Sequence, residues 1–184
     1  AVLVDRYSAS ASEIFAGAIQ DYKRGLIIGH RTFGKGTVQA IQDLSLGQIK
    51  ITESKFYRVT GESTQNRGVI PDIELPSTWD IETIGESSLH LSLPWDSINP
   101  VKYRAFKLDQ DIMAAVKKSY LSRLNDSPNL EYLKNLRMRY DESSDKKELS
   151  LNILNRQFEK EQRRAWILDT ENNRREELGL DIFK

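Results

Sequence analysis

The chain has 184 residues, enough for one ordinary domain or a small domain with an appended one, and 27 lysines and arginines balance 27 aspartates and glutamates. The formal net charge of zero gives no global attraction to nucleic acid, and we expect no nucleic-acid partner. The absence of cysteine excludes thiolate nucleophiles, disulfides and the usual structural zinc sites, and two histidines leave little for a metal centre, so we predict neither metal nor organic cofactor.

The first part of the chain predicts a strand, a helix and a second strand. Residues 1–5 form a short continuous apolar run, which is typical of a buried, parallel strand. Apolar residues recur at helical spacing over residues 12–24, and Gly25 follows as a stop signal. Residues 26–28 predict a second buried strand, which the right-handed crossover rule makes parallel to the first.

The next part of the chain changes to a strand pattern. Three stretches are rich in β-branched and aromatic residues and predict strands, at residues 37–41, 48–52 and 56–60. A polar connection follows over residues 61–68. Residues 69–73 predict a short extended segment, because the proline at position 71 disfavours a helix at the residue before it.

The C-terminal part is predicted to be helical. Apolar residues at helical spacing mark residues 109–124, 129–140 and 151–178, and the charged last helix is typical of a solvated face. We therefore expect a mixed α/β core, made of a strand-helix-strand unit and β-hairpins, that is followed by a helical region. The expected division is residues 1–76, a linker with one short helix at 77–107, and residues 108–184.

Ser10 lies where the first strand gives way to the helix. Ser10 and Glu13 have the spacing of a capping box, in which the serine caps the helix and the glutamate reaches back to it. Capping is the ordinary role of such a serine, but a nucleophile at a helix N-terminus also lies near free N–H groups that can stabilise an oxyanion. Both roles stay open on the pattern alone.

Lys35 follows Ser10 by 25 residues and lies between Gly34 and Gly36. Most lysines are solvated, and a lysine acts as a base only where burial disfavours its ammonium form. Flanking glycines permit the close backbone approach that such burial needs. Gln39, four residues on, could hold the lysine amine, although an ordinary polar strand residue is the simpler interpretation.

A phosphate-binding loop is the rival interpretation of the same segment. Residues 29–36 come within one residue of G-x-x-x-x-G-K-[ST], but Gly36 has no hydroxyl for Mg²⁺ and a strand pattern follows where the motif needs a helix. We therefore expect no nucleotide to bind.

Three ordered segments, at residues 2–14, 32–39 and 68–73, resemble the carboxy-terminal processing proteases, and the charged helical tail resembles the periplasmic tail-specific proteases of Gram-negative bacteria. The resemblance implies a serine endopeptidase with Ser10 as nucleophile, Lys35 as general base and Gln39 positioning the lysine. It implies an oxyanion hole made by the backbone N–H of Ala11 and by a glycine that lies outside these residues.

The resemblance also implies substrates, partners and a location. It implies polypeptide substrates with apolar C-termini, an N-terminal half and a PDZ domain of the same protein, an adaptor protein, and a periplasmic protein associated with the inner membrane. The chain starts within an expected strand, so we expect a piece of a larger protease that is inactive by itself. The alternative is a non-catalytic interaction module whose helical tail docks a partner and whose Ser10 only caps a helix.

Overall fold

The computed structural model describes residues 1–107, 109–124 and 126–184, which form two compact units. The first contains Ala1–Leu75 and Trp79–Ala114, and the second contains Pro76–Thr78 and Ala115–Lys184. The expected division of the chain stays a prediction, and its last boundary, at Leu108, lies outside the described residues.

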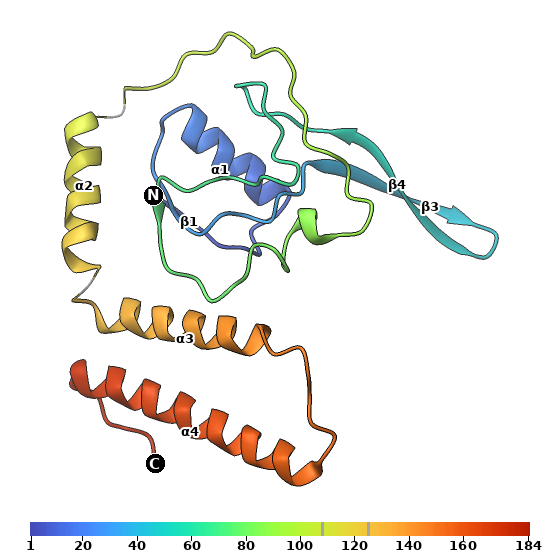
Figure 1. The fold of residues 1–184 in the computed structure, drawn as a ribbon. Helices are drawn as coiled ribbons and strands as arrows, with labels where there is room; N and C mark the ends of the chain where they lie inside the picture. Colours follow the sequence, from blue (N-terminus) through green and yellow to red (C-terminus); the bar gives the residue numbers. More distant parts are fainter. Residues whose placement is uncertain (108, 125) are drawn as a thin grey trace. The chain divides into compact units, whose positions relative to one another are not determined.

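The first unit contains a parallel sheet in the order β1-β2-β5, formed by Val2–Val4, Ile27–Gly29 and Ile73–Glu74. Helix α1 (Ala11–Asp21) connects β1 to β2 (Figure 1), which confirms the predicted strand-helix-strand unit and the parallel pairing of its strands. The pairing puts Val4 opposite Gly29, so the segments that leave the two strands start side by side.

The apolar core lies on one face of this sheet, where Val4, Ala16, Ile27 and Val69 are buried together. The prediction of a buried first strand holds for Val4, which is 7% exposed, and was wrong for Leu3, whose side chain is 76% exposed. Strand residues point alternately to opposite faces, and within this chain α1 contributes Ala16 to the core on one face only.

Strands β3 (Thr37–Leu44) and β4 (Gly47–Lys55) form a separate antiparallel hairpin that extends away from the rest of the unit in Figure 1. The predicted strand at residues 56–60 was wrong, since only an isolated bridge joins Tyr57 to Ser63. Gly61 donates to the Arg58 carbonyl in a tight turn, and the Arg58 guanidinium pairs with the buried Asp21 carboxylate of α1. These two contacts lie where the chain leaves the hairpin.

The predicted short helix within residues 77–107 is the 3₁₀ turn η1 (Glu86–Ser88). Residues 79–107 belong to the first unit, and several of their backbone groups form hydrogen bonds with other residues of that unit. The Arg6 guanidinium, which is buried, donates to the carbonyls of Ile81, Ile84 and Thr32.

The second unit is helical, as predicted. It contains most of α2 (Gln110–Arg123), together with α3 (Pro128–Ser144) and α4 (Ile153–Glu177), and α3 packs against α4. None of the described residues of these helices is fully buried. Charged side chains cover the packing surface, as where the Arg174 guanidinium lies over the Tyr132 ring. The mixed α/β class with a helical C-terminal region is therefore confirmed.

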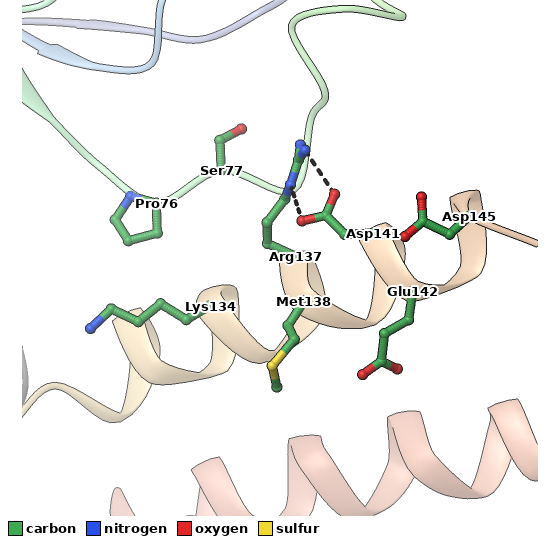
Figure 2. A pocket seen from close by; sticks show the side chains of 8 residues that line it. All are labelled: Pro76, Ser77, Lys134, Arg137, Met138, Asp141, Glu142 and Asp145. Atoms are coloured by element: carbon green, nitrogen blue, oxygen red, sulfur yellow. Dashed lines mark hydrogen bonds and ion pairs between the residues drawn. The ribbon is translucent and has the colours of Figure 1, made fainter.

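Two further features of the described residues bear on function. None of their helices is long and apolar enough to cross a membrane. A hollow of about 440 Å³ in the second unit is lined mainly by α3 (Figure 2), with Arg137 paired to Asp141 along one wall. None of the predicted catalytic residues lines this hollow.

Candidate active site

Ser10 is the N-cap of α1 and has a strained backbone, with φ 57° and ψ −115°. A residue with a side chain seldom adopts a positive φ, and such conformations cluster at functional sites where the surrounding structure enforces them. A sharp strand-to-helix turn with a strained serine also presents the nucleophile of many hydrolases. Sequence patterns gave no sign of this strain.

The predicted capping box between Ser10 and Glu13 is present. The Ser10 N–H donates to Glu13 Oε2 at 2.9 Å, whereas the half that involves the Ser10 hydroxyl falls short of a full capping hydrogen bond. Ala11 is the first residue of α1, so its N–H has no acceptor within the helix. Ser10 is half-buried, and the first N–H of α1 lies directly after it.

Lys35 lies in a turn of residues 33–36, which we call the lysine turn. Both glycines of the turn are buried against the segment that contains Gln65 and Asn66. A Cβ added at Gly34 would lie 2.9 Å from the Asn66 carbonyl carbon, and one at Gly36 would lie 2.7 Å from the Gln65 nitrogen. The glycines therefore provide the close backbone approach that the sequence predicts.

The Glu13 carboxylate joins residues 8–13, which we call the serine segment, to the lysine turn. It is fully buried and accepts four hydrogen bonds, from Ser10 N–H, Thr32 Oγ1, Gly34 N–H and Lys35 N–H. The backbone N–H groups of Ser10 and Lys35 bind the same oxygen, Oε2, at 2.9 and 2.8 Å. The backbone nitrogens of Ser10 and Lys35 therefore lie no farther apart than the sum of these two hydrogen-bond lengths.

Burial raises the pKa of Glu13, while the hydrogen bonds from Thr32, Gly34, Ser10 and Lys35 oppose the rise. An ionised carboxylate suits the site, since all four hydrogen-bonding neighbours donate to it. Thr32 Oγ1 lies only 2.5 Å from Oε1 and also accepts from the Val69 N–H. A buried carboxylate therefore fixes two chain segments that are 25 residues apart.

The lysine side chain and its predicted partner occupy different surroundings. Lys35 is half-buried, and its Nζ donates to the Thr37 carbonyl at 3.0 Å. Gln39 lies on β3, just past an irregularity between Val38 and Gln39, and its Nε2 donates to Thr52 Oγ1 of β4 at 3.2 Å. The amide of Gln39 is thus engaged across the hairpin, and its predicted hold on Lys35 stays a prediction.

Three residues of this region were not singled out from the sequence as site residues. Glu13 was recognised only as a capping residue, although it also binds the lysine turn. Gln65 accepts from the Gly36 N–H at 2.9 Å, and Arg6 donates to the Thr32 carbonyl. Gln65 lies in a stretch that resembled an ordinary polar connection, so no sequence signal marked it.

His30 directly follows β2, and its neighbours in the sequence predict no partner for its ring. The structure instead brings Glu74 Oε1 of β5 to 3.4 Å from His30 Nδ1. This contact follows from the pairing of β2 with β5, which sequence spacing alone does not reveal. His30 nevertheless lies outside the group of residues that Glu13 connects.

The geometry also bears on a phosphate-binding loop and on a metal site. Gly36 leads directly into β3, so the helix that a phosphate-binding loop requires is absent after the lysine turn. Within the described ranges, no group of three or more histidine, aspartate and glutamate side chains is placed to hold a metal ion.

Comparison with known proteins gives a consistent result along the chain. Residues 1–75 match Peptidase family S41, and residues 79–184 match the C-terminal domain of tail specific protease. The chain is 40% identical over its whole length to the tail-specific protease of Haemophilus influenzae and spans 28% of that protein.

Other relatives match only the first part. Over 40% of the chain, the identity is 49% to the chloroplastic C-terminal processing peptidase of Tetradesmus obliquus, of which 16% is covered. A solved photosystem II D1 C-terminal processing protease matches 40% of this chain and 19% of its own, at 49% identity and a TM-score of 0.37. The match to the C-terminal domain of tail specific protease covers more than half of the chain, and with the match of residues 1–75 to Peptidase family S41 it shows that the chain belongs to the tail-specific proteases.

Proposed function

We propose that the protein containing this chain is a serine endopeptidase in which Ser10 is the nucleophile and Lys35 the general base. The observation that carries the proposal is the Glu13 carboxylate, which binds the N–H groups of both residues through one oxygen. The strained backbone of Ser10 adds support, because strain of this kind persists where function requires it.

In the proposed reaction, the Ser10 Oγ–H proton passes to Lys35 Nζ as Oγ bonds to the scissile carbonyl carbon. The N–H of Ala11 and one further donor stabilise the resulting oxyanion. Lys35 then returns the proton to the leaving amine as the C–N bond breaks. Water attacks the acyl-enzyme and loses its proton to Lys35, which passes it to Ser10 Oγ as the bond between Oγ and the acyl carbon breaks and the second product leaves.

Lys35 must be uncharged to begin this cycle. In this chain the side chain is half-buried and its Nζ donates one hydrogen bond, to the Thr37 carbonyl. A neutral amine can donate that bond and still accept the Ser10 hydroxyl proton through its lone pair. We propose that Gln39 completes the support of the amine in the assembled protease.

The substrate and the cellular setting follow from family membership and are part of the proposal. We propose polypeptide substrates recognised by apolar C-terminal tails, delivered with the help of a PDZ domain and an adaptor protein. The PDZ domain and the second oxyanion donor would lie in the rest of the protein, since this chain spans 28% of its Haemophilus relative. We propose a periplasmic location, in association with the inner membrane.

A direct test uses the 184-residue chain beside the full-length protein. The chain alone should show essentially no turnover of an apolar-tailed peptide, because losing one oxyanion donor costs on the order of 10² to 10³ in rate. Adding the remaining part in trans should restore some cleavage. Turnover at the full rate by the isolated chain would contradict the proposed division of the site, and no turnover by the full-length protein would favour the interaction module.

A further inference from the structure

The backbone of the lysine turn is held from two sides. Each of its four N–H groups is bonded, to the Ser8 carbonyl, to both oxygens of Glu13 and to the Gln65 side chain. The first three acceptors come from the serine segment. The acceptor for Gly36, directly after the lysine, is the Gln65 amide oxygen.

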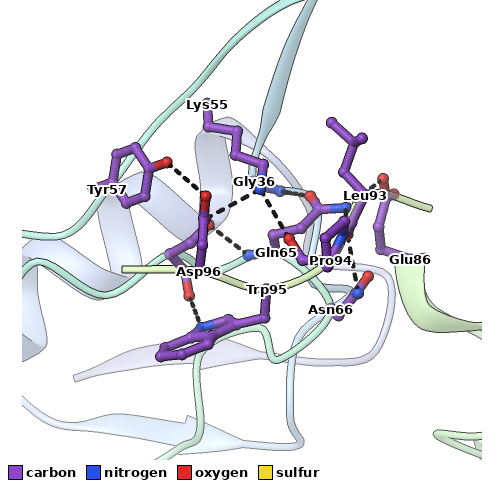
Figure 3. Close-up of polar contacts among 11 residues, drawn as sticks. Gly36, Lys55, Tyr57, Gln65, Asn66, Glu86, Leu93, Pro94, Trp95 and Asp96 are labelled. Atoms are coloured by element: carbon purple, nitrogen blue, oxygen red, sulfur yellow. Dashed lines mark hydrogen bonds and ion pairs between the residues drawn. The ribbon is translucent and has the colours of Figure 1, made fainter. Parts of the chain in front are cut away.

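Gln65 is itself fixed from the other side. Its side chain is fully buried, and while Oε1 accepts from Gly36, Nε2 donates to Glu86 Oε1 at 3.2 Å and to the Leu93 carbonyl at 3.1 Å (Figure 3). The backbone of Glu86 also donates to the Phe33 carbonyl at 3.0 Å. Two residues of the 79–107 segment therefore contact the lysine turn directly or through Gln65.

Only an amide meets these demands. The position needs an acceptor toward Gly36 and a donor toward Glu86 and Leu93, and a rotated amide would oppose donor to donor and acceptor to acceptor. An ionised glutamate would keep the acceptor but lose both donors. It would also bring a second carboxylate to the buried Glu86.

A movement of Gln65 would also displace the backbone next to Lys35. Gly36 packs so closely that an added Cβ would meet the Gln65 nitrogen at 2.7 Å and Ser63 Oγ at 2.8 Å. Close-packed backbone cannot absorb a shift of Gln65 without moving Gly36, which is the neighbour of Lys35.

We infer that Gln65 is a positioning residue for Lys35, through which Glu86 and Leu93 set the place of the lysine turn. The inference rests on the proposed role of Lys35 as general base. It also assigns a role in the active site to residues 86–93, which lie outside the part that matches Peptidase family S41.

The test compares five variants of the full-length protease on an apolar-tailed peptide. Gln65→Glu should lower kcat on the order of 10²-fold, as a misplacement of about 1 Å does, and leave KM within about twofold because Gln65 does not touch the substrate.

The double variant Gln65→Glu with Glu86→Gln is the rescue. Residue 86 then supplies the donor, residue 65 keeps the acceptor for Gly36, and the Leu93 carbonyl still accepts from Asn66 Nδ2. Most of the lost kcat should return, with KM unchanged. Gln42→Glu, on an exposed position of β3, controls for the added charge and should behave as the unchanged protein.

Three results would overturn the inference. They are an unchanged kcat in Gln65→Glu, a kcat loss that matches the unfolded fraction of that variant, and no recovery in the double variant, whether folded or not. Ser10→Ala and Lys35→Ala are measured in the same assay. If either retains full turnover, the proposed function fails; if both are inactive and Gln65→Glu is normal, only the role of Gln65 fails.

Discussion

The lysine turn and the β3–β4 hairpin follow one another in the chain, yet they are held in opposite ways. Every N–H of residues 33–36 is bonded to groups from other segments, and Gly34 and Gly36 are buried. The hairpin forms a sheet of its own, and residues 41–54 are exposed.

The difference teaches where positional precision is built into this chain. Lys35 lies on the fixed side of the boundary, and Gln39 lies just beyond it on a two-stranded ribbon that is only marginally stable by itself. Buried polar side chains around the turn, such as Glu13 and Gln65, take the place that apolar packing has in an ordinary core. Fully satisfied polar networks of this kind specify one arrangement.

Removing the reacting groups should have the largest effect. In the full-length protease, Ser10→Ala and Lys35→Ala should each lower kcat on the order of 10⁴-fold or more, and the double variant should be no worse than either. Lys35→Arg should be equally inactive, since a guanidinium does not deprotonate. Lys50→Ala, at an exposed hairpin position, is the matched control. Additive losses in the double variant would show that the two residues do not act as a unit.

Breaking the link between the two segments should have the next largest effect. Glu13→Gln places an N–H₂ group among donors, so either Ser10 and Lys35 or Thr32 and Gly34 lose their shared acceptor, and kcat should fall on the order of 10²-fold. Peptide turnover and thermal unfolding are measured together. Wild-type kcat in a folded Glu13→Gln protein would refute the linking role of this carboxylate.

The hairpin side of the comparison predicts a smaller effect. Gln39→Ala should lower kcat about tenfold if the residue supports the lysine amine, a smaller loss than a 1 Å misplacement causes. Thr52→Val removes the partner that Gln39 has in this chain and should leave kcat unchanged. Equal losses in both variants would instead assign Gln39 to the hairpin.

The smallest expected effect is on stability. Since burial raises the pKa of Glu13, this carboxyl holds its proton more tightly in the folded chain than in the unfolded chain. In the unfolded chain, the pKa of a glutamate is about 4.3. Unfolding then releases a proton, so the free energy of unfolding falls as pH rises from that value through the raised pKa. Glu13→Gln should lack this decline in denaturant titrations across that range. An identical pH dependence in both proteins would contradict the assigned shift.

Much of the framework could be predicted because its signals are local. The helix from Ala11, the parallel strands on either side of it and the three C-terminal helices follow from apolar periodicity and stop signals. The capping box follows from the spacing of Ser10 and Glu13.

The failures come from contacts between distant segments. The exposure of Leu3, the exit of the chain at Arg58 and the Glu74 neighbour of His30 depend on which segments meet in space. Gln65 could not be identified because a glutamine in a polar stretch has no periodic signature, and its importance arises only where Gly36, Glu86 and Leu93 converge.

The central claim is that one carboxylate brings a serine nucleophile and a lysine base together. A crystal structure of the full-length protein measures this most directly, through the distance between Ser10 Oγ and Lys35 Nζ. The account predicts hydrogen-bond reach, about 2.6 to 3.2 Å, or a somewhat longer distance that tightens with a bound acyl group. Side chains that point apart, with Nζ turned to solvent while Glu13 still binds both backbones, would contradict it.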